Sequence, residues 1–123
     1  MTNPAIQAYQ QVGAQTVPQR DLEANLLSAA AAHFERIRND WALLGSELPT
    51  ALKFNRKLWT VFVTSVTDAE SPLPAEVREN VANLGVFVLS QTAELQAAPV
   101  PEKLDALVRI NRQLAAGLRG SAG

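Results

Sequence analysis

Apolar residues recur along the chain at intervals of three and four positions, in four stretches separated by short breaks. This spacing places apolar side chains on one face of an α-helix, whereas a half-buried strand would alternate at every second position. The pattern predicts helices over residues 18–44, 49–67, 74–97 and 101–118. The apolar positions expected to face a core are Leu22, Leu26, Ala30, Phe34, Ile37, Trp41, Leu44, Leu52, Trp59, Phe62, Val63, Val66, Val77, Val81, Leu84, Val88, Leu95, Leu104, Leu107, Val108, Leu114 and Leu118.

An apolar residue followed by proline opens each predicted helix: "VPQRDL" at 17, "LPTALK" at 48, "LPAEVR" at 73 and "VPEKLD" at 100. Proline suits the first helical turn because its φ is already set and its missing N–H would be unpaired there anyway. The short connections favour antiparallel neighbours. The sequence therefore predicts an all-α fold, an antiparallel up-down four-helix bundle.

The predicted bundle does not take up the whole chain. Residues 1–17 form an N-terminal segment, residues 18–119 the bundle domain, and residues 120–123 a flexible tail. Ile6, Tyr9 and Val12 have the spacing of a short amphipathic turn or helix. We expect this segment to pack on the bundle.

Two asparagines interrupt the apolar faces, Asn55 in the second helix and Asn111 in the fourth. In an up-down bundle these helices run in the same direction, and the two amides lie at depths that differ by roughly 6 Å. A buried amide without a partner costs about 1–3 kcal/mol. We therefore expect both to be buried and hydrogen-bonded, to main-chain groups of the N-terminal segment or of an interhelix loop. With Trp59 they form a predicted structural motif, and direct contact with a ligand is the alternative.

Composition and charge narrow the class of protein. The chain has 123 residues, of which 47% are hydrophobic and 19% charged, which suits one globular domain. It contains no cysteine, and its longest apolar run, "LGVFVL", is too short to span a bilayer. Its start lacks the basic and apolar regions of a signal peptide. We expect a cytoplasmic protein, and its net charge of -1 gives no general attraction to nucleic acid or to a membrane.

Catalytic and metal-binding patterns are missing from the sequence. His33 is the only histidine, and we expect it to be a partly buried packing residue. No nucleophile triad, phosphate-binding loop or metal-spaced cluster occurs, so we expect no enzyme activity, no cofactor and no metal. Small basic patches occur at Lys53, Arg56 and Lys57 and at Arg109 and Arg112. We interpret them as solvated helix faces, and contact with RNA phosphates remains the alternative.

Some apolar residues exceed what the four core faces need. Phe54 and Val61 lie off the main face of the second helix, and Gly85, Val86 and Phe87 extend the apolar face of the third. We predict that Phe54, Val61 and Phe87 line a groove for a partner chain, with Ile6 and Tyr9 as a removable lid. Cover by the N-terminal segment alone, or scattered exposure, is the alternative.

Five segments carry a resemblance to a known family: "QAYQQ" at 7–11, "PQRDLEANLL" at 18–27, "NRKLW" at 55–59, "LPAEVRENVANLGVFV" at 73–88 and "INRQLAAGL" at 110–118. In these segments the chain resembles the flagellar biosynthesis regulator FlaF family. The resemblance covers nearly the whole chain, and the order and spacing of these pieces make it fairly specific. Gln19 stands where the family more often has arginine, so no role is carried over to Arg20.

The opening, "AIQAYQQVGAQTVPQRDLEANLL", is also similar to the start of the flagellin export chaperone FliS. That family is an antiparallel helical bundle whose N-terminal segment can occupy part of the surface used by flagellin. The resemblances imply a non-enzymatic, flagellin-binding chaperone or regulator that controls flagellin synthesis or secretion, with FlbT as a functional partner. The alternative is an RNA-associated regulator of flagellin message, acting directly or with FlbT.

Overall fold

A computed structural model describes residues 17–70 and 74–119. In this part of the chain there is no strand, and the order of elements is α2 (Val17–Asn39), α3 (Trp41–Leu44), the 3-10 helix η1 (Gly45–Glu47), α4 (Leu48–Thr67), α5 (Ala75–Ala97), the 3-10 helix η2 (Pro101–Lys103) and α6 (Leu104–Leu118). The all-α prediction and the four long helices are confirmed. Within the same residues, no helix is both long enough and apolar enough to cross a membrane.

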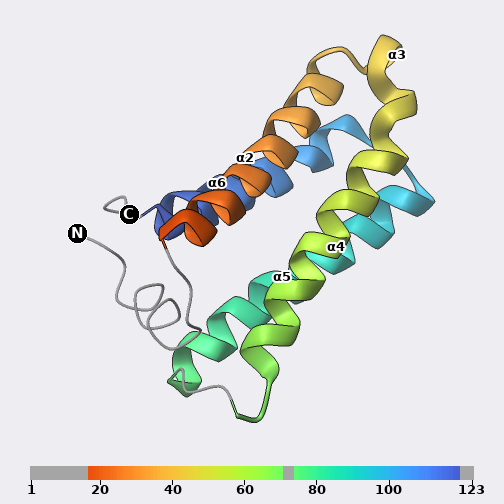
Figure 1. Ribbon diagram of the computed structural model, residues 1–123. Helices are drawn as coiled ribbons and strands as arrows, with labels where there is room; N and C mark the ends of the chain where they lie inside the picture. Colours follow the sequence, from red (N-terminus) through yellow and green to blue (C-terminus); the bar gives the residue numbers. More distant parts are fainter. Residues whose placement is uncertain (1–16, 71–73, 120–123) are drawn as a thin grey trace.

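The four long helices are arranged as two antiparallel pairs. Figure 1 shows α2 beside α6 and α4 beside α5, with α3 and η1 leading from the first pair to the second. Contacts are most extensive within each pair, while α2 with α4 and α5 with α6 make the weaker contacts between pairs. Each helix therefore has two neighbours, as expected for an up-down bundle.

The core lies where the two pairs meet. Its largest fully buried side chains include Trp59 from α4 and Phe34 from α2, with Leu95 from α5 and Leu107 from α6. On α2 the buried face is Ala24, Leu27, Ala31 and Phe34, which also follows the three-and-four spacing. The prediction that Leu22 faces the core is wrong, because its side chain is 58% exposed. Leu84, 42% exposed, is a second such error.

The first predicted helix, 18–44, is interrupted at Asp40. Helix α2 ends at Asn39, and Asp40 adopts φ -137° and ψ 59°. The Asp40 carbonyl accepts hydrogen bonds from the N–H groups of Leu43 (3.1 Å) and Leu44 (2.8 Å), which form the single turn α3. Asparagine and aspartate favour turns over helix interiors, so the pair Asn39–Asp40 is a natural break. This turn redirects the chain so that α4 can return along α2.

Candidate functional site

Asn111 is the centre of a buried polar cluster between the two helix pairs. Its Oδ1 accepts a hydrogen bond from the indole N–H of Trp59 at 2.9 Å. Its Nδ2 donates to Asn55 Oδ1 at 2.7 Å and, more weakly, to the main-chain carbonyl of Leu27 at 3.4 Å. Both asparagines and Trp59 are completely buried. The cluster thus joins α2, α4 and α6 at one depth in the core.

The indole of Trp59 determines how the two amides are oriented. Because an indole N–H can only donate, Asn111 must present its oxygen to Trp59 and therefore its nitrogen to Asn55. Asn55 must then present its own oxygen, and its Nδ2 is left buried with no hydrogen-bond partner among the described residues. One donor in the core is therefore unsatisfied, a destabilising feature.

The predicted burial and hydrogen bonding of Asn55 and Asn111 are confirmed. The N-terminal segment, one of the two predicted sources of main-chain partners, lies outside the described residues, and no described interhelix loop bonds to either amide. Among the described residues, the amides bond to each other, to Trp59 and to a carbonyl within helix α2. They meet because α4 and α6 place them at matching depths, so each supplies the other's partner.

Phe54 and Val61 form one exposed apolar edge of α4. Their side chains are 43% and 62% exposed. On the same helix Val63 packs against Gly85 of α5, so the Val63 flank is the one that faces α5. At about 100° per residue, Phe54 lies about 180° and Val61 about 160° around the helix from Val63. The two residues therefore point away from α5, on the side of α4 next to α2.

Phe87 and Leu84 form a second exposed edge, on α5. Phe87 is 41% exposed and lies about 160° around its helix from Gly85, the residue that packs against α4. Phe87 and Phe54 therefore lie on opposite edges of the α4–α5 pair. The prediction that Phe54, Val61 and Phe87 line one groove is wrong, although all three side chains are exposed. Ile6 and Tyr9, the predicted lid, lie outside the described residues.

The sequence analysis did not recognise that Leu22 and Leu26 lie on the flank of α2 that carries His33, each about 20° around the helix from it. His33 of α2 hydrogen-bonds through Nε2 to Glu47 Oε1 at 2.7 Å, just before α4 begins. Leu26 lies seven residues before His33 on α2, and Phe54 lies seven residues after Glu47. Each is therefore about 10 Å along its own helix from the His33–Glu47 contact. Leu22, one turn further along α2, is then level with the next turn of α4. The same helix contains a second three-and-four pattern: Ala24, Leu27, Ala31 and Phe34. This pattern could have indicated that Leu22 does not face the core.

The cations of α4 have no ion-pair partners among the described residues. Lys53, Arg56 and Lys57 are all exposed, and α4 contains no acidic residue. Lys57 lies about 60° from Phe54 and about 40° from Val61, to one side of both apolar side chains and between them only along the helix axis. Arg56 lies about 20° from Val63, on the flank that faces α5. The three cations therefore divide between two sides of the helix.

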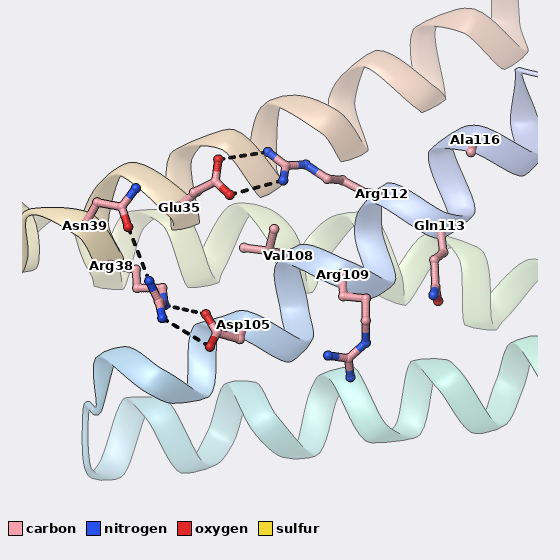
Figure 2. A pocket seen from close by; sticks show the side chains of 9 residues that line it. All are labelled: Glu35, Arg38, Asn39, Asp105, Val108, Arg109, Arg112, Gln113 and Ala116. Carbon is pink, nitrogen blue, oxygen red and sulfur yellow. Dashed lines mark hydrogen bonds and ion pairs between the residues drawn. The ribbon is translucent and has the colours of Figure 1, made fainter.

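A polar hollow of about 500 Å³ lies over α2 and α6, and its charges are largely paired. Figure 2 shows Arg38 bonded to Asp105, and Arg112 bonded by two nitrogens to both carboxylate oxygens of Glu35, each at 3.1 Å. The hydrogen bonds and charge of Arg112 hold the pKa of Glu35 below its ordinary value.

Among the residues drawn in Figure 2, Arg109 points away from both ion pairs. Among residues 17–70 and 74–119, Arg112 of the predicted basic patch is paired with Glu35 while Arg109 has no ion-pair partner, so the hollow offers an anion little uncompensated positive charge. Within the described part of the chain, no group of three or more histidine, cysteine or acidic side chains is placed to hold a metal ion.

The family model "Flagellar protein FlaF" matches residues 5–118. The chain belongs to the FlaF family. No curated protein and no solved structure matches the chain. The family match covers the N-terminal segment as well as α2 to α6, so it includes the lid residues Ile6 and Tyr9. The exposed apolar edges of α4 and α5 are the candidate interaction surfaces of this FlaF-family chain.

Proposed function

We propose that this FlaF-family protein is a non-enzymatic, cytoplasmic flagellin-binding chaperone or regulator, which controls the synthesis or secretion of flagellin. The observation that carries the proposal is the exposure of large apolar side chains along the α4–α5 pair: Phe54, Val61, Leu84, Val86 and Phe87. Large apolar side chains exposed on the outer edges of a bundle are typical of protein-binding sites. FlbT is a second partner in this proposal.

Flagellin chemistry fits such a surface. The ends of flagellin are amphipathic segments that polymerise by burying their apolar faces, so before export these faces need cover. A helical bundle supplies cover when the apolar face of a partner helix packs against an exposed apolar edge. The apolar residues on α4 and α5 lie on helices that are already packed in the bundle. Binding a partner there therefore costs little additional conformational entropy.

The test is co-purification from motile cells, with mass spectrometry of the bound chains, at moderate and at high salt. Flagellin should be recovered at both salt concentrations, because burial of apolar surface does not weaken with salt as phosphate contacts do. Purified flagellin monomers should then bind the purified protein directly. Failure of this direct binding would refute the proposal.

The alternative, an RNA-associated regulator of flagellin message, depends on the exposed cations Lys53, Arg56 and Lys57. Flagellin message that co-purifies at moderate salt and is lost at high salt would favour it. So would loss of activity when all three cations are neutralised while flagellin capture is unaffected.

A further inference from the structure

We propose that the outer surface shared by α4 and α2 binds one amphipathic partner helix that carries carboxylates beside its apolar face. We call this surface the α4 edge, and it consists of Phe54, Lys57 and Val61 on α4 with Leu22 and Leu26 on α2. The inference rests on the proposed function, because it assigns the flagellin contact to one of the two exposed edges and gives the chemistry of the segment bound.

The apolar residues of the α4 edge have a spacing that suits contact with a partner helix. Phe54 and Val61 are seven residues apart, two helical turns, and Leu58 between them is half-buried against the core. Leu22 supplies a 58% exposed side chain from the neighbouring helix. A partner helix lying along α4 would therefore contact apolar groups on both of its sides, through residues at three-and-four spacing.

The charge on the α4 edge determines which partner helix fits. Lys57 lies beside the two apolar side chains of α4, at a height between them along the helix axis, and Lys53 lies one turn before it. Neither lysine has an ion-pair partner among the described residues, and α4 has no acidic residue of its own. A partner with a carboxylate next to its apolar face would pair with Lys57, whereas a basic or fully apolar helix would not.

The same charge argues against the chain's own N-terminal segment as the permanent occupant. Residues 1–16, "MTNPAIQAYQQVGAQT", contain no aspartate or glutamate, so they cannot supply the carboxylate. Ile6 can contribute apolar contacts and Tyr9 apolar contacts and a neutral hydroxyl, but neither carries a negative charge. An acidic amphipathic partner therefore has an interaction with Lys57 that the N-terminal segment lacks.

The experiment measures the affinity of purified flagellin monomers for variants on the two edges. We expect Phe54→Asp and Val61→Asp each to weaken binding by about tenfold or more. Phe87→Asp is the matched control, because Phe87 has nearly the same exposure, 41% against 43% for Phe54, on the opposite edge. It should change the affinity by less than roughly twofold, and circular dichroism should show all variants folded; Phe54→Ser is the milder substitute if Phe54→Asp unfolds.

Charge reversal provides the second measurement. Lys57→Glu should weaken binding by about threefold at low salt, with the difference shrinking as salt is added, because an exposed ion pair is screened. Arg56→Glu is its control, since Arg56 lies on the other flank of the same helix and should have no comparable effect. Lys57→Ala should give an intermediate loss.

Three results would overturn the inference. If Phe87→Asp weakens binding as much as Phe54→Asp, or if Arg56→Glu matches Lys57→Glu, flagellin binds elsewhere and only the assignment to the α4 edge is lost. If the α4-edge variants instead abolish self-association, measured by light scattering, and leave flagellin affinity unchanged, the occupant is a second copy of this chain. If the unaltered protein binds no flagellin, the proposed function is refuted as well.

Discussion

Among the described residues, the side chain of Asn111 makes three hydrogen bonds and that of Asn55 accepts one, so Asn111 carries more of the buried polar bonding. Asn111→Leu should leave the Trp59 indole N–H and the whole Asn55 amide unpaired in the core, at a cost of about 2–4 kcal/mol of unfolding free energy. Asn55→Leu removes the donor that already lacks a partner and leaves Asn111 bonded to Trp59 and Leu27. It should cost about 1–2 kcal/mol less than Asn111→Leu.

Urea unfolding of the two variants measures this difference. Both substitutions enlarge the side chain by a similar amount, so overpacking contributes to each and largely cancels in the comparison. An Asn55→Leu variant that is as unstable as Asn111→Leu would show that the hydrogen bonds are not arranged as described.

At the scale of the helices, the α4–α5 pair depends on Gly85. A Cβ at this position would overlap Val63 Cγ2, and Trp59 is the next neighbour. In an unconstrained helix, glycine to alanine would stabilise by about 1 kcal/mol. Gly85→Ala should instead destabilise the protein by about 1–3 kcal/mol, because the β-branched Val63 has little rotamer freedom to move aside. Adding Val63→Ala should recover part of this loss in thermal unfolding, and additive losses would contradict the close contact.

The α2–α6 pair has a pH-dependent contact in Glu35–Arg112. The pKa of Glu35 is lowered from 4.5, chiefly by the hydrogen bonds from Arg112. A carboxyl whose pKa is lower in the folded state stabilises the fold above its unfolded pKa, and this stabilisation is lost as the pH falls through the folded value. The difference in unfolding free energy between the unaltered protein and Glu35→Gln should therefore be constant at neutral pH and shrink below about pH 4.5.

A matched variant for this measurement is Glu102→Gln. Glu102 is exposed and has no ion pair among the described residues, so its substitution should change the unfolding free energy little. If Glu35→Gln behaves in the same way, the ion pair on the surface of the bundle contributes nothing measurable, as many exposed pairs do.

At the scale of the whole molecule, the N-terminal segment is the predicted regulator of partner access. Deleting residues 1–15 should tighten flagellin binding by removing a competitor for the apolar edge, an increase of several-fold that isothermal titration would detect. Ile6→Asp with Tyr9→Asp in the full-length chain should have the same effect if the lid works through apolar contacts. A deletion that leaves the affinity unchanged, with the melting temperature preserved, would eliminate the lid.

Much of the architecture was available from the sequence because it depends on local physics. The three-and-four spacing of apolar residues and the proline openings identified four helices, and their short connections implied an up-down arrangement. The break at Asn39–Asp40 was also visible in the residues, but Trp41 and Leu44 continue the apolar spacing across it and concealed it. Burial of Asn55 and Asn111 followed from their positions within apolar faces.

What only the tertiary structure decided is how the faces of different helices are turned toward one another. Spacing gives the angle between two residues of one helix, but the neighbour that a flank meets is determined by packing between helices. The contact of Val63 with Gly85 places Phe54 and Phe87 on opposite edges, and the alanine-rich face of α2 packs into the core and leaves Leu22 exposed. Likewise the partners of the two amides required the depths of α4 and α6 to match in space, which no local pattern along the chain contains.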